Sequence, residues 1–137
     1  MRRQLLDSNL LIRHWRLSRR GDLATKTRAD AARWAAQLIE TRHSRLIATP
    51  VVVEFLAGVQ SSHELDLARA YLEQFSVIDK GEIPRRDWDE ARRLAQRVPP
   101  DGSPRQLGDC LLKAIAIRFR CDVDTRDKRF PGTAGDK

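Results

Sequence analysis

The sequence is poor in residues that bind metals through nitrogen or sulfur. It contains two cysteines and three histidines in 137 residues, and their spacing matches no zinc-binding pattern. The two thiols, Cys110 and Cys121, cannot form a disulfide scaffold and are compatible with a reducing compartment. The hydrophobic residues, 41% of the chain, therefore have to supply the core of what we expect to be one domain.

Long apolar runs are also absent. No segment approaches the roughly 18 consecutive apolar residues that a membrane-spanning helix needs. Asp7 and Arg13 interrupt the apolar N-terminal stretch before it could act as a signal peptide. We therefore expect a cytoplasmic protein that has no contact with a membrane.

Basic side chains outnumber acidic ones. There are 26 lysines and arginines against 19 acidic residues, for a net charge of +7, and most of these cations are arginines. Because a guanidinium group matches the geometry of phosphate, this composition favours a polyanionic partner such as nucleic acid. A coding bias toward arginine, with the cations spread over the surface, would explain the charge equally well.

Short apolar runs alternate with helical patterns along the chain. The runs at 5–6, 46–48, 77–78 and 121–125 predict strands, and residues 99–104 predict a loop rich in proline. Helices are predicted over 10–19, 28–42, 49–58, 61–75, 87–98 and 107–119. Thr49 and Ser61 are predicted as N-caps, and Trp88 is expected on the apolar side of its helix. This alternation predicts an α/β fold in which a short parallel sheet is flanked by helices. Functional sites in such folds lie beyond the C-terminal ends of the strands.

Most acidic residues suit polar, solvent-exposed helix faces or loops. They are Asp22, Asp30, Glu40, Glu64, Asp66, Glu73, Asp79, Glu82, Asp87, Asp89, Glu90, Asp101 and Asp136.

Four other carboxylates stand in apolar surroundings or directly after strands. Asp7 and Asp127 each follow a predicted strand, Glu54 lies inside an apolar run, and Asp109 opens the last helix. Each has an ordinary explanation taken alone: a helix cap for Asp7, an arginine partner for Glu54, a helix N-terminus for Asp109 and a turn for Asp127. A parallel sheet can nevertheless bring all four to one edge. Converging carboxylates without histidine or cysteine favour Mg²⁺ or Mn²⁺, which would support phosphodiester hydrolysis.

The same positions carry a family resemblance. The segments Leu5–Asn9, Thr49–Gly58, Gly108–Asp109 and Thr125–Phe130 resemble, in order and spacing, those of PIN-domain ribonucleases, and most closely the VapC-type toxins of toxin–antitoxin pairs. The resemblance implies a three-layer α/β/α sandwich over residues 1–130, followed by a polar tail at 131–137. It also implies a Mg²⁺- or Mn²⁺-dependent endoribonuclease that cleaves RNA.

The resemblance further assigns roles to individual residues. Asp7, Asp109 and Asp127 would be metal ligands, and Glu54 would bind the ion directly or through water. Ser8, Asn9 and Thr125 would orient ligands or water. A cognate antitoxin would cover the acidic site with an arginine or lysine near the carboxylates, and homodimers would be typical.

The last predicted strand departs from the family pattern. Asp122 and Asp124 replace apolar residues there and lie on the same face of the strand. We expect both to be exposed at the edge of the sheet, with Asp124 as an extra member of the acidic site in the alternative interpretation.

A basic RNA- or DNA-binding module without catalysis is the competing hypothesis. It explains the net charge and leaves Glu54 unexplained. Trp15, Trp34 and Trp88 could stack on bases, but their helical positions favour core or interface roles. The pairs Arg19–Arg20, Arg85–Arg86 and Arg92–Arg93 are candidate phosphate contacts.

Overall fold

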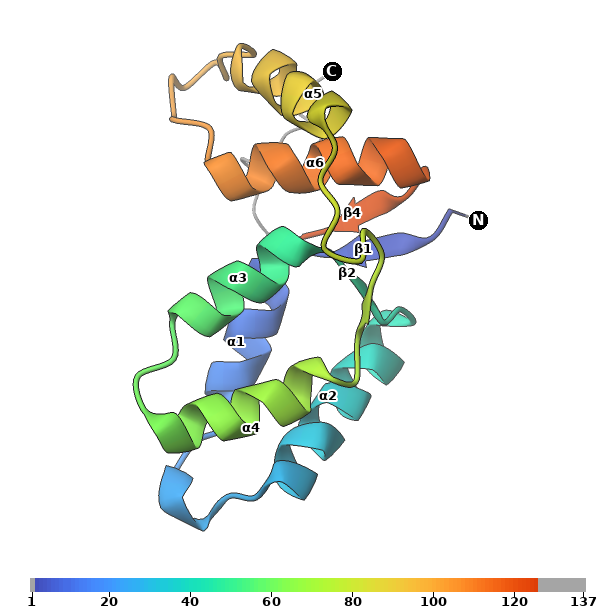
Figure 1. The fold of residues 1–137 in the computed structure, drawn as a ribbon. Coiled ribbons are helices and arrows are strands. Elements are labelled where there is room, and N and C mark those ends of the chain that lie inside the picture. Colours follow the sequence, from blue (N-terminus) through green and yellow to red (C-terminus); the bar gives the residue numbers. More distant parts are fainter. Residues whose placement is uncertain (1, 126–137) are drawn as a thin grey trace.

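The molecule is built on a four-stranded parallel sheet. The computed structural model describes residues 2–125, and its sheet has the strand order β3-β2-β1-β4 (Figure 1). The strands are β1 (Gln4–Leu6), β2 (Leu46–Ile47), β3 (Ser76–Val77) and β4 (Asp122–Asp124). Leu5 pairs with Leu46 on one side and with Val123 on the other. The predicted strands are thus confirmed, and all their C-terminal ends meet at one edge of the sheet.

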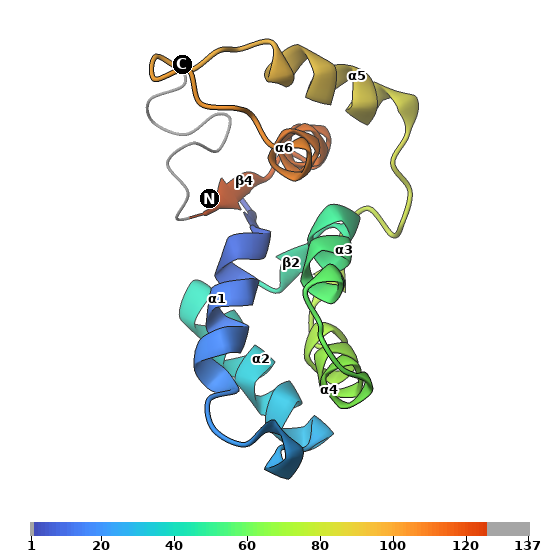
Figure 2. The ribbon, with the colours of Figure 1, turned by 90° about the vertical axis from the view of Figure 1, so that its left-hand side faces the viewer.

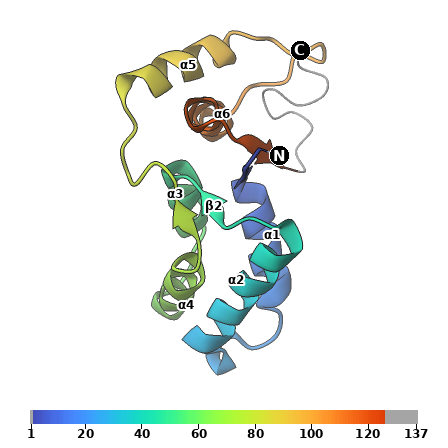
Figure 3. The ribbon, with the colours of Figure 1, turned by 90° about the vertical axis from the view of Figure 1, so that its right-hand side faces the viewer.

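Six α-helices within residues 2–125 surround the sheet. They are α1 (Ser8–Ser18), α2 (Arg28–Arg42), α3 (Thr49–Ala57), α4 (Ser62–Leu72), α5 (Arg85–Ala95) and α6 (Leu107–Phe119), with a short 3₁₀ turn at Leu23–Thr25. Figures 2 and 3 show α1 and α2 on one side of β2, with α3 and α4 on the other. Helix α2 packs against α4, and α5 packs against α6. The arrangement is the predicted three-layer α/β/α sandwich.

Local sequence explains where several helices begin. Thr27 and Asp30 form a reciprocal capping box at the start of α2, and Ser61 accepts a hydrogen bond from the Glu64 amide at the start of α4. Thr49 is not the N-cap that we predicted, because Ala48 occupies that position and the Thr49 hydroxyl bonds to a side chain elsewhere. Helix α5 begins at Arg85 and ends at Ala95, two to three residues earlier than predicted at each end.

Aromatic side chains from three helices form the centre of the core. The Phe55 and Tyr71 rings stack with centroids 5.3 Å apart, and Trp15 meets both edge-on. Trp15 and Trp34 are buried as expected. Trp88 is 44% exposed, which contradicts its predicted position on the apolar side of α5, because the neighbouring Asp87 takes the inward position instead.

None of the described helices is long and apolar enough to cross a bilayer.

Candidate metal site at the sheet edge

Asp7 lies at the C-terminal end of β1 and is 1% exposed. Its amide donates to the Asp124 carbonyl at 3.1 Å, which extends the pairing between β1 and β4. Its carbonyl accepts the first hydrogen bonds of α1, but its carboxylate makes no capping bond. The side chain instead accepts a hydrogen bond from the Thr125 hydroxyl at 2.6 Å, and the Ser8 hydroxyl oxygen lies 3.4 Å from its Oδ1. Capping therefore does not explain this buried carboxylate.

Ser8 connects Asp7 to the second predicted site residue. The Ser8 side chain is buried, and its Oγ lies 2.7 Å from Glu54 Oε2. A hydroxyl has one proton to donate, and the shorter distance favours donation to Glu54. A single serine thus orients a carboxylate on α3 toward the end of β1.

Glu54 faces the start of α6. A Cβ atom at Gly108 would overlap Glu54 Oε1, so the absence of a side chain at 108 is what lets this carboxylate lie there. Asp109 is the next residue and lies, partly buried, in the first turn of α6. Although Glu54 lies inside an apolar run of the sequence, its side chain is exposed, because α3 turns this face away from its packed side.

The structure therefore links two of the four predicted carboxylates through Ser8 and places the third next in sequence to a glycine that Glu54 contacts. Asp7 follows β1, Glu54 lies on α3 and Asp109 lies in the first turn of α6. Asp127 lies outside the described residues. Asn9 is exposed at the start of α1.

The donors in this group are hard oxygen atoms. Carboxylates and hydroxyls without nitrogen or sulfur suit Mg²⁺ or Mn²⁺. Within residues 2–125, no three side chains of the His, Cys, Asp and Glu types are grouped closely enough to hold an ion. The chemistry fits a hard divalent ion, although the described side chains alone do not make a complete ligand set.

The two acidic residues of β4 each lie near an arginine. β4 is an edge strand, and Asp122 is exposed and 3.6 Å from Arg2. Asp124 is partly buried, and its carboxylate lies 3.5 Å from an Arg42 guanidinium nitrogen. The expected exposure therefore holds for Asp122 only, and Asp124 is held by an arginine.

Sequence reasoning missed a further buried carboxylate at the same edge. Asp79 follows β3, is buried, and accepts hydrogen bonds at Oδ1 from the Thr49 amide at 3.0 Å and hydroxyl at 2.9 Å. Its Oδ2 is buried without a hydrogen-bond partner in the described part of the chain. The sequence pattern instead suggests a polar, exposed position for Asp79. The signal was present, because Asp79 directly follows an apolar run just as Asp7 does.

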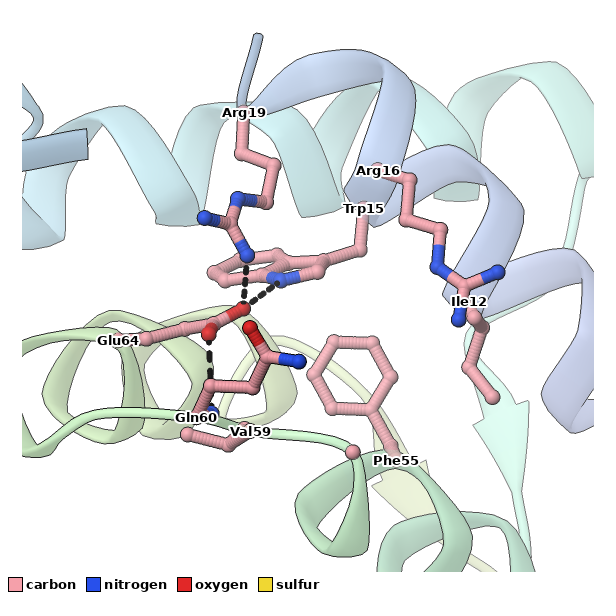
Figure 4. A pocket seen from close by; sticks show the side chains of 9 residues that line it. Ile12, Trp15, Arg16, Arg19, Phe55, Val59, Gln60 and Glu64 are labelled. Atoms are coloured by element: carbon pink, nitrogen blue, oxygen red, sulfur yellow. Dashed lines mark hydrogen bonds and ion pairs between the residues drawn. The ribbon is translucent and has the colours of Figure 1, made fainter. Parts of the chain in front are cut away.

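Glu64 and Asp87 were also wrongly expected at the surface. Glu64 accepts hydrogen bonds from the Trp15 indole at 3.0 Å and the Gln60 amide at 3.1 Å, and it pairs with Arg19 (Figure 4). Burial alone would raise the pKa of Glu64, but these hydrogen bonds and the Arg19 charge hold that pKa below its usual value.

Glu64 lines a pocket of about 200 Å³ between α1, the end of α3 and the start of α4. Figure 4 shows Arg16, Arg19 and Phe55 around the same pocket. The pocket lies toward the far end of α1 from Ser8. The Glu64 carboxylate is fully engaged by Trp15, Gln60 and Arg19. These contacts hold α1 to α4, and the pocket does not belong to the sheet-edge site.

Comparison with protein families places this geometry in context. A model of the PIN domain family matches residues 5–136, which include all four predicted site carboxylates. A comparison with curated proteins finds no match. PIN domains are generally metal-dependent nucleases that use divalent ions, in agreement with the oxygen donors at the sheet edge. From the fold, the acidic edge and the extent of the match, the chain belongs to the PIN domain family.

Proposed function

We propose that the protein is a Mg²⁺- or Mn²⁺-dependent endoribonuclease, and that it acts as the toxin of a VapC-type toxin–antitoxin pair. The observation that carries the proposal is a pair of hydrogen bonds to carboxylates, from Thr125 to Asp7 and from Ser8, whose hydroxyl lies beside Asp7, to Glu54. Asp7 is 1% exposed, and hydroxyl donors on adjoining elements orient both this carboxylate and Glu54, as the ligands of an ion would require.

The proposed ligands are Asp7, Asp109 and Asp127, with Glu54 binding directly or through water. A divalent ion bound there would polarise the phosphate and lower the pKa of a water molecule. Thr125 and Ser8 fix the orientations of the Asp7 and Glu54 carboxylates. Glu54 is exposed to solvent, so its Oε atoms can orient an attacking water and accept its proton. The net charge of +7 would attract the RNA backbone.

The biological partners follow from the VapC-type proposal. An antitoxin that places an arginine or lysine among the carboxylates would occupy the position of the ion's charge. Homodimers would be the expected assembly. A growth assay addresses the toxin role, since expression of the wild-type protein should arrest cells and expression of Asp7→Asn should not.

The decisive experiment is cleavage of an end-labelled, structured RNA pool by purified protein. Reactions contain Mn²⁺, Mg²⁺ or EDTA, and Asp7→Asn controls for a contaminating nuclease. Asp66→Asn, which changes an exposed carboxylate on α4, is the matched control. We expect metal-dependent cuts from the wild type and Asp66→Asn, and none from Asp7→Asn.

Identical cuts from the wild type and Asp7→Asn would identify a contaminant and refute the assignment. RNA binding without any cutting, unchanged in Asp7→Asn, would support the non-catalytic binding module instead.

A further inference from the structure

Helix α5 presents an exposed aromatic ring between arginines. Of the three tryptophans, Trp15 and Trp34 are buried, whereas Trp88 is 44% exposed. Arg85 and Arg92 lie three residues before and four residues after Trp88 on the same helix, so they occupy the same helical face as its ring. Both arginines are exposed. We refer to Arg85, Trp88 and Arg92 as the α5 face.

The outward direction of Trp88 is fixed by what α5 buries. Asp87, Ala91 and Leu94 form the inward side of the helix. The Asp87 carboxylate receives the Arg118 guanidinium of α6, with Nε 3.0 Å from both carboxylate oxygens. Since successive residues on a helix are about 100° apart, pinning Asp87 inward turns Trp88 toward solvent.

The arginines of this face are weakly engaged within the protein. Arg85 lies 3.9 Å from the exposed Asp89 carboxylate, a separation that gives little stability in water. Arg92 forms no ion pair within the described residues. Arg93, on another side of the helix, is by contrast held closely by Glu90. Two cations beside Trp88 are therefore available to a ligand.

We propose that the α5 face binds single-stranded RNA, with a base stacked on Trp88 and adjacent phosphates contacted by Arg85 and Arg92. An exposed indole flanked by guanidinium groups is the combination that single-stranded nucleic acid requires. Helix α5 packs along α6 (Figure 1), with Asp87 bonded to Arg118 in the last turn of α6 and Asp109 in the first turn of that helix. An RNA held beside Trp88 would therefore have to extend along α6 to reach the acidic site. The proposal rests on RNA being the substrate of the proposed function, but it concerns binding and not cleavage.

Intrinsic fluorescence provides a direct test, because Trp88 is the one exposed tryptophan of the three in the sequence. The wild type in EDTA is titrated with a 12-nucleotide single-stranded RNA of mixed sequence, and Kd is measured separately by anisotropy of a labelled RNA. We expect RNA to quench the fluorescence and to shield it from acrylamide. Trp88→Ala should abolish the RNA-dependent quenching and weaken binding by at least about fivefold.

Charge variants separate stacking from electrostatic attraction. Arg92→Gln should weaken binding and reduce the salt dependence of Kd. Arg33→Gln, which removes an exposed arginine from α2, should change both much less. Asp89→Asn removes the carboxylate nearest Arg85 and should tighten binding. Thermal unfolding of each variant should match the wild type, since every substituted side chain is exposed.

Unchanged fluorescence on RNA binding, or equal Kd values for the wild type and Trp88→Ala, would overturn the proposal. Fluorescence that varies with protein concentration in the absence of RNA, with Trp88→Ala shifted toward monomer, would assign the face to a second copy of the chain and also overturn it. Trp88-dependent binding without Asp7-dependent cleavage would refute the nuclease and leave the α5 face standing. Asp7-dependent cleavage, with RNA binding that does not depend on Trp88, would support the nuclease and overturn the proposal for the α5 face.

Discussion

Removing Asp87 should destabilise the protein by breaking a buried ion pair between α5 and α6. The Asp87 side chain is 2% exposed, and the Arg118 side chain is 19% exposed. Three nitrogen–oxygen contacts of 2.9–3.0 Å join the two groups, and Arg118 also donates to the Glu82 carbonyl at 3.2 Å. Asp87→Ala would leave this guanidinium without its counter-charge in a largely desolvated position.

The expected cost follows from that geometry. Removing one partner of a buried ion pair costs about 3–5 kcal/mol, because an uncompensated charge remains buried. Arg118 retains some contact with water, so we expect the lower end, about 3 kcal/mol for Asp87→Ala. In a domain of this size, that loss corresponds to a decrease in Tm of roughly 10 °C.

Urea denaturation of a double-mutant cycle measures the effect. Asp87→Ala, Arg118→Met and the double variant are compared with Asp89→Ala, which removes an exposed carboxylate from the same helix. We expect the double variant to be more stable than Asp87→Ala, with a coupling energy of about 1–3 kcal/mol. Asp89→Ala should change stability by no more than about 0.5 kcal/mol. Additive effects of the two single substitutions, each below about 1 kcal/mol, would refute the reasoning.

Two further predictions concern the acidic edge and the buried Glu64. Gly108→Ala should displace the Glu54 carboxylate and lower RNA cleavage by roughly a hundredfold. Thermal stability should stay the same or rise, since alanine favours helices. Unchanged cleavage would show that Glu54 can move without consequence. Because the pKa of Glu64 is lowered in the folded state, its contribution to stability is full at neutral pH. That contribution is lost as the pH falls from the ordinary value, about 4.3, through the folded-state value. Stability of Glu64→Gln should therefore depend less steeply on pH in this acidic range, and parallel urea-midpoint curves for both proteins would contradict this.

The sequence predicts those parts of the structure that depend on local patterns. Helix 28–42 has its capping box within three residues of its start, and helix 107–119 has a clear apolar face, so both are found at the predicted bounds. The carboxylates after apolar strands are conspicuous for the same local reason. Helix α5 was less predictable, because Asp87 takes the buried position that the apolar pattern gives to Trp88.

The buried carboxylates that were missed depend on partners far away in the chain. Asp79 bonds to Thr49 across 30 residues, Asp87 to Arg118 across 31, and Glu64 to an indole across 49. Asp79 has a local signal, the apolar run before it, but nothing near Asp87 or Glu64 distinguishes either from a solvent-exposed residue. Packing decides these positions, because a carboxylate can be buried only where the fold delivers a donor or a cation.

The sheet edge joins the stability of the fold to the orientation of the proposed site. Two aspartates that each follow a strand accept hydrogen bonds from a threonine that follows the adjacent strand. Thr125, after β4, bonds to Asp7, after β1, and Thr49, after β2, bonds to Asp79, after β3. The first pair orients a proposed ligand directly. The second fixes the first residue of α3, so the position of Glu54 depends both on the start of its helix and on its hydrogen bond to Ser8 at 2.7 Å. The same contacts that close the edge of this short sheet therefore set the direction of its carboxylates, which is why the acidic residues can be held in place before any ion binds.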